Sequence, residues 1–152
     1  MKNSAFLVSF ILYCGLFSQN VIVSHARLPP FPPEIMHDCM DRENVTAKEL
    51  MILDTSPEET IKMLGSDGED FRNIGCFLAC AFQQRGDMSG STMNVQTMID
   101  RMHGMHHGHI NAAPYFTNAL QTCADSLGEV DDECEAALAF HVCLMEAFHN
   151  KS

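Results

Sequence analysis

The chain has 152 residues, a length that suits one domain with a core of moderate size. Its 20 Asp and Glu against 9 Lys and Arg give a formal net charge of −11. This acidity argues against nucleic acid and anionic membranes as partners, because both attract basic surfaces. No apolar run approaches the roughly 20 residues that span a bilayer, so we expect no membrane anchor.

Residues 1–26 have the layout of a signal peptide. Lys2 supplies a positive charge, residues 5–17 are mostly apolar, and small residues at 24–26 offer a cleavage site. We therefore expect a secreted mature domain over 27–152. Cleavage would also remove Cys14 and leave six cysteines. An even number of cysteines in an oxidising compartment favours a disulfide framework over a metal site.

Short helices are predicted in the first part of the mature domain. A proline-rich lead-in ends at Pro33, which suits the first turn of a helix over Glu34–Arg42. Thr46 and Glu49 form a capping box ahead of a second short helix. Residues 56–65 carry a third start signal and end on a glycine.

Longer helices are predicted in the second part. One covers Asp70–Arg85 and is closed by Gly86, and amphipathic stripes predict two more, over Val95–Met102 and Phe116–Leu127. The last helix is expected to begin near Asp131, within an acidic cluster that complements the helix dipole. No alternating strand pattern is present, so the predicted fold class is all-α.

The spacing of the six cysteines restricts their pairing without fixing it, because 15 connectivities exist. Cys76 and Cys80 lie about one turn apart on one helix, where a bridge between them would constrain almost nothing. Cys134 and Cys143 point to opposite sides of the last helix. Cys76 and Cys80 are therefore expected to form disulfides with two different elements, and so are Cys134 and Cys143.

The intervals Cys76-x3-Cys80 within one helix and Cys134-x8-Cys143 near the end resemble the signature of the six-cysteine insect odorant-binding and pheromone-binding proteins, which has C-x3-C in the third helix and C-x8-C near the end. The resemblance covers essentially the whole mature chain, although the interval between Cys39 and Cys76 is longer than in most members. It implies a compact bundle of about six helices around an apolar cavity, cross-linked by three interlocked disulfides. The implied pairs are Cys39–Cys80, Cys76–Cys134 and Cys123–Cys143.

The resemblance also implies a function. The protein would be an extracellular carrier of small hydrophobic molecules, such as odorants or pheromones, in a fluid such as sensillar lymph. It would need no cofactor or metal, and a chemosensory receptor would be a further candidate partner for a monomer or homodimer. The apolar stripes suggest ligand-binding residues, any of which could instead fill a solid core: Met51, Leu78, Phe82, Met98, Met102, Phe116, Leu120, His141, Met145 and Phe148.

Several polar features have more than one interpretation. His141 is either a structural histidine or a pocket group that hydrogen-bonds a ligand and becomes charged at low pH. The segment His103–His109 is a metal-binding tract, a pH-sensitive loop or a solvated glycine-rich loop. Asn44 stands in a glycosylation acceptor sequence with Thr46, which already has a capping role.

Two other classes of function compete with the carrier. An enzyme is disfavoured because the chain has no HExxH motif, no Gly-x-Ser-x-Gly elbow, and no free cysteine once six are paired. The stronger alternative is a secreted helical signalling or protein-interaction ligand without a small-molecule cavity. Saturable uptake of apolar molecules distinguishes the carrier from this alternative.

Overall fold

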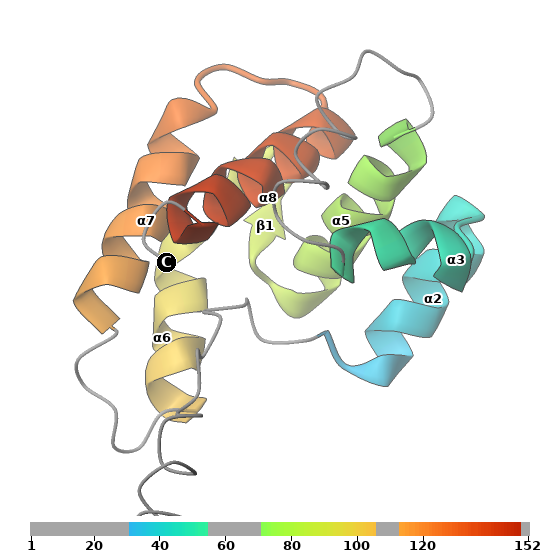
Figure 1. The fold of residues 1–152 in the computed structure, drawn as a ribbon, viewed down its shortest axis with the longest axis horizontal. Helices are drawn as coiled ribbons and strands as arrows, with labels where there is room; N and C mark the ends of the chain where they lie inside the picture. The colour runs from blue at the N-terminus through green and yellow to red at the C-terminus, as the bar shows by residue number, and fades with distance from the viewer. Residues whose placement is uncertain (1–30, 55–70, 106–112, 150–152) are drawn as a thin grey trace, which may run out of the picture.

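The structure is a computed structural model that describes residues 31–54, 71–105 and 113–149 (Figure 1). The all-α prediction is confirmed, with one short hairpin added. The elements are α2 (Pro33–Glu43), α3 (Ala47–Leu50), the 3-10 helix η1 (Met51–Asp54), α5 (Arg72–Arg85), β1 (Met88–Ser89), β2 (Thr92–Met93), α6 (Val95–Met105), α7 (Ala113–Ser126) and α8 (Glu133–His149).

Some predictions fall outside these ranges. The signal peptide over 1–26, the helix start at 56–65 and the histidines at 106, 107 and 109 lie beyond the described residues. Within the ranges described, no helix combines the length and apolar character needed to cross a membrane.

Helix α5 packs along α8 and forms the centre of the core (Figure 1). Phe77 and Leu78 are 1% exposed, and Phe82 is fully buried. The ring of Phe82 meets that of Phe140 on α8 edge to face, with centroids 6.1 Å apart. Since α5 also contacts α2 on another side, this helix is enclosed by its neighbours rather than lying on the surface.

Three disulfides join four helices in series. Cys39–Cys80 links α2 to α5, Cys76–Cys134 links α5 to α8, and Cys123–Cys143 links α8 to α7. These are the pairs that the family resemblance implies. The bridged residues are 41, 58 and 20 positions apart, so each bridge contributes about 3 to 4 kcal/mol in the chain-entropy model.

The helix boundaries follow the predicted caps. Thr46 and Glu49 form the capping box, with the Thr46 hydroxyl 2.6 Å from the Glu49 carboxylate. Gly86 ends α5 in the left-handed conformation, at φ +81°. At the start of α8 the cap is Asp132, whose side chain accepts a hydrogen bond of 2.9 Å from the amide of Glu135. Asp132 also binds Arg72 of α5 at 2.7 Å, so it holds these two helix starts together.

A hairpin that was not predicted follows α5. Strands β1 and β2 pair antiparallel, with Met88 opposite Met93. Gly90 has φ +57°, the left-handed conformation that a two-residue hairpin turn requires. Each strand has only two residues, too few to produce an alternating pattern in the sequence.

A buried charge cluster anchors this hairpin. Asp87 is fully buried and forms ion pairs with Arg85 and Arg101. Arg101 also donates to the carbonyl of Arg85 at 2.8 Å, and the Arg85 guanidinium lies 4.2 Å from the ring centroid of Phe31. Burial lowers the pKa of Arg85, and the neighbouring Asp87 carboxylate opposes that effect. The cluster thus ties the end of α5, the hairpin and α6 together.

Candidate functional site

Helices α6, α7 and α8 bring one group of the predicted ligand-binding residues close together. Met98 and Met102 lie on α6, which packs against α7 (Figure 1). Phe116 and Leu120 lie on α7, and both are buried. The ring of Phe116 stacks on that of Phe148 at the end of α8, with centroids 4.8 Å apart and an interplanar angle of 16°. Helices α6, α7 and α8 therefore contribute methionine, leucine and phenylalanine side chains to one core cluster, against which Phe148 packs.

The start of α7 is fastened to the end of α8 by a polar contact as well. The Tyr115 hydroxyl donates a hydrogen bond to the carbonyl of Ala147. The Tyr115 ring also meets Phe148 at 6.0 Å in an edge-to-face arrangement. Together with the Cys123–Cys143 bridge, these contacts join α7 to α8 at two points.

Two of the remaining predicted residues, Leu78 and Phe82, belong to the same core cluster. Leu78 and Phe82 lie on α5 in the main core, where Phe82 contacts Phe140 and also Phe31 at 5.5 Å. Met145 on α8 is half-buried. Met51 is 64% exposed at the start of η1, so the structure does not bring it to the other predicted residues. We leave Met51 out of the proposed ligand-binding set.

His141 combines partial exposure with an isolated polar atom. The residue as a whole is half-buried, but its Nε2 atom is buried and has no hydrogen-bond partner. No other side-chain nitrogen or oxygen within the described ranges is in this state. Burial lowers the pKa of His141 from its ordinary value of 6.5 to about 4, because the charged ring would lose its hydration.

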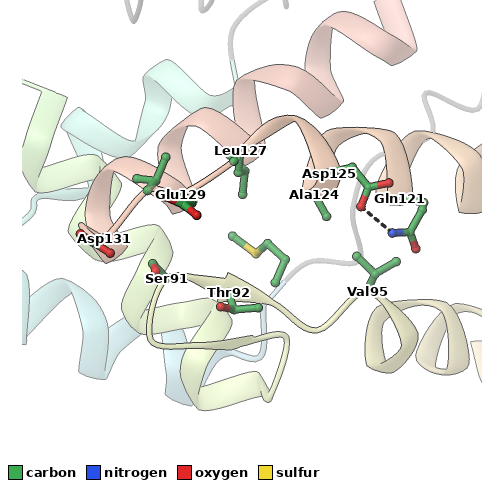
Figure 2. Close-up of a pocket in the computed structure, with 12 residues that line it drawn as sticks. Ser91, Thr92, Val95, Gln121, Ala124, Asp125, Leu127, Glu129 and Asp131 are labelled. Carbon is green, nitrogen blue, oxygen red and sulfur yellow. Dashed lines mark hydrogen bonds between the residues drawn. The ribbon is translucent and has the colours of Figure 1, made fainter.

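A surface pocket of about 530 Å³ lies elsewhere, between the hairpin and the C-terminal end of α7 (Figure 2). Its polar lining includes the acidic side chains of Asp125, Glu129 and Asp131, and its apolar part includes Met93 and Leu127. None of the ten residues predicted to bind ligand lines this pocket. Glu129 and Asp131 belong to the acidic cluster that was expected to complement the dipole of the last helix, and the unpredicted hairpin supplies the opposite wall of the pocket.

The structure also shows the surroundings of the residues that could bind a metal or be glycosylated. Asp38, Cys39 and Cys80 place ligand-type atoms within 4.8 Å of one another, but the two sulfurs are bonded to each other and only the carboxylate remains. His103 is exposed on α6. Asn44 is exposed at the end of α2, in a left-handed conformation with φ 53°.

Comparison with known proteins gives one finding. The family model described as the PBP/GOBP family matches residues 33–147, a range that contains all six cysteines of the disulfide framework. No curated protein and no solved structure matches the chain.

Proposed function

Because the chain belongs to the PBP/GOBP family, the insect pheromone-binding and odorant-binding proteins, we propose that it carries small hydrophobic molecules in an extracellular fluid. The observation that carries this proposal is the family match over residues 33–147, which begins at the start of α2 and ends within the last turn of α8. The disulfide framework and the acidic surface suit a soluble protein of an oxidising compartment. Residues 1–26 would direct secretion and be removed, so the N-terminus of the secreted protein should be Arg27.

The proposed binding surface is formed by Met98 and Met102 of α6, Phe116 and Leu120 of α7, and Phe148 of α8. Unbranched methionine side chains such as Met98 and Met102 adapt to ligands of different shape, because they have several rotatable bonds and a polarizable sulfur. The stacked rings of Phe116 and Phe148 give this surface a rigid flat element at one end. Such a combination suits apolar ligands that differ in chain length or ring content.

Displacement of an apolar fluorescent probe tests the carrier directly. The oxidised protein beginning at Arg27 would be titrated with N-phenylnaphthylamine, and bound probe would then be displaced by small hydrophobic compounds. The probe signal is clear of protein fluorescence, since the chain has no Trp. We expect saturable binding with one probe per chain.

Paired methionine variants locate the binding surface. Met102→Gln places a polar amide on the buried face of α6 and should weaken probe binding about tenfold or more. Met51→Gln makes the same change at an exposed position and should leave binding unaltered. Circular dichroism would check that both variants remain folded. If the folded wild-type protein takes up no probe, the carrier proposal is wrong, and a secreted signalling or interaction ligand becomes the better interpretation.

A further inference from the structure

The acceptor sequence Asn44-Val45-Thr46 forms the junction between α2 and α3. Asn44 ends α2 in the left-handed conformation, and the backbone amides of Asn44 and Val45 both donate to the carbonyl of Met40. The side chain of Val45 is buried, whereas Asn44 and Thr46 on either side of it are exposed. The junction therefore presents to solvent the two side chains that an N-glycosylating enzyme recognises.

The carboxamide of Asn44 has no part in holding this junction together. The turn uses the backbone of Asn44, because asparagine tolerates the left-handed conformation better than most residues other than glycine. None of the hydrogen bonds formed among the described residues uses its side chain. A glycan on the Nδ2 atom would therefore displace no hydrogen bond formed within those ranges.

The hydroxyl of Thr46, in contrast, is engaged in the folded protein. It donates to the Glu49 carboxylate at 2.6 Å and accepts from the Glu49 amide at 3.3 Å. Since the acceptor sequence requires this hydroxyl, transfer of a glycan must come before the capping box closes. The order of synthesis allows this, because Asn44 enters the secretory compartment ahead of Cys80, and until Cys80 arrives Cys39 cannot tie α2 to α5.

From these observations we propose that Asn44 carries an N-linked glycan. The inference rests on entry of the chain into the secretory pathway, which is part of the proposed function. In the transfer, the Nδ2 atom of Asn44 forms a bond to the anomeric carbon of an oligosaccharide carried on a polyisoprenoid pyrophosphate. The bond from that carbon to the pyrophosphate oxygen breaks, the lipid pyrophosphate leaves with the electron pair, and Nδ2 loses one proton.

The glycan would stand apart from the proposed binding surface. Figure 1 shows α2 and α3 beside α5, on the side away from α6 and α7. A glycan at the end of α2 would thus add a large hydrated group to one face of the molecule and leave the binding residues of α6 and α7 uncovered. Glycosylated and unglycosylated protein should therefore bind the fluorescent probe equally well.

Peptide mass spectrometry of protein secreted by cultured insect cells tests the proposal. The full chain would be expressed, and glycans would be released enzymatically in heavy-oxygen water, which converts a glycosylated asparagine into a labelled aspartate. We expect the label at position 44, and a fall in the mass of the whole protein on release. Asn150-Lys151-Ser152 is a second acceptor sequence, so Asn150→Asp is the control and should keep the glycan on Asn44.

Three variants at the junction separate glycosylation from folding. Asn44→Asp, which suits the left-handed backbone, and Thr46→Ala should both lose the glycan completely, whereas Thr46→Ser keeps a hydroxyl and should retain it. Secreted wild-type protein without label at position 44 would overturn the proposal, and so would a label that persists in Thr46→Ala. A chain that remains in the cytosol would overturn both this proposal and the secretion on which it rests. Absence of probe binding by protein labelled at position 44 would contradict the carrier alone.

Discussion

Gly75 of α5 lies directly against the backbone of Cys134 of α8. A Cβ atom at position 75 would stand 2.5 Å from the carbonyl oxygen of Cys134, a distance that real side-chain carbons do not adopt. Only glycine therefore allows the two helices to approach this closely. The same approach brings the neighbouring Cys76 to a Cα–Cα distance of 4.2 Å from Cys134, its disulfide partner.

Gly75→Ala is expected to destabilise the protein by about 1 to 3 kcal/mol, because α5 and α8 must separate to admit the methyl group. Denaturant unfolding of the oxidised protein measures the change. Gly104→Ala on α6 is the matched control, since a Cβ there would meet nothing within 4 Å. It should be neutral or stabilising by up to about 1 kcal/mol, as alanine favours a helix. Equal stabilities for the two variants would show that the tight approach is not a constraint.

Asp87→Ala is expected to cost about 3 to 5 kcal/mol, because it leaves the buried Arg85 guanidinium without its carboxylate. Asp100→Ala removes an exposed carboxylate whose partner is Gln96 and should change stability by less than about 0.5 kcal/mol. Thermal unfolding of both variants gives the comparison. A small effect for Asp87→Ala would mean that Arg85 and Arg101 reach water when the carboxylate is removed.

The pKa of His141 predicts a loss of stability in acid. The unfolded chain takes up a proton near the ordinary value of 6.5, whereas the folded protein does not until about 4. The free energy of unfolding should therefore fall as the pH decreases between these values, at about 1.4 kcal/mol per pH unit, and be unaffected by this group above 6.5. Carboxylates also titrate in this range, so the contribution of His141 is obtained by comparing the wild-type protein with a variant that lacks this histidine.

Unfolding of wild type and His141→Met at about pH 7 and about pH 4.5 isolates the histidine. The variant should lose about 2 to 3 kcal/mol less stability than wild type over this interval. His149→Met, exposed on the same helix, should behave as wild type. Parallel pH profiles for wild type and His141→Met would contradict the burial of this ring.

The two disulfides of α8 should contribute different amounts to the free energy of unfolding. Replacing both cysteines of the Cys76–Cys134 pair by alanine opens a loop of 58 residues, against 20 for Cys123–Cys143. In the chain-entropy model the first loss exceeds the second by about 1 kcal/mol. Urea unfolding of the two double variants checks the order, and a reversed order would show that packing around Cys123 outweighs loop length.

Local sequence signals predicted most of the helix boundaries. Thr46 with Glu49, Gly86 and Pro33 each have a conformational preference that acts within one turn, and the structure shows all three in the expected roles. The disulfide pairing, in contrast, could not be predicted from local signals. Helix geometry only excluded pairings within a helix, and the remaining connectivity came from the resemblance to the family.

Long-range features were not predictable. The burial of Asp87 depends on Arg101, 14 residues away, and on the hairpin between them. Periodicity showed that Met98 and Phe116 face inward, but not whether they meet a solid core or a ligand. Met51 lies in a helical stretch too short for periodicity to define a buried face, and its side chain is exposed.

The serial arrangement of the disulfides has a consequence for protease resistance. The three bridged segments are 39–80, 76–134 and 123–143, and each overlaps the next along the chain. Any single peptide-bond cut between Cys39 and Cys143 therefore falls inside at least one covalent ring and releases no fragment. A nicked molecule would keep its mass, apart from one added water, until it is reduced. In a fluid rich in proteases, such a protein would continue to hold its helices together after its backbone has been broken.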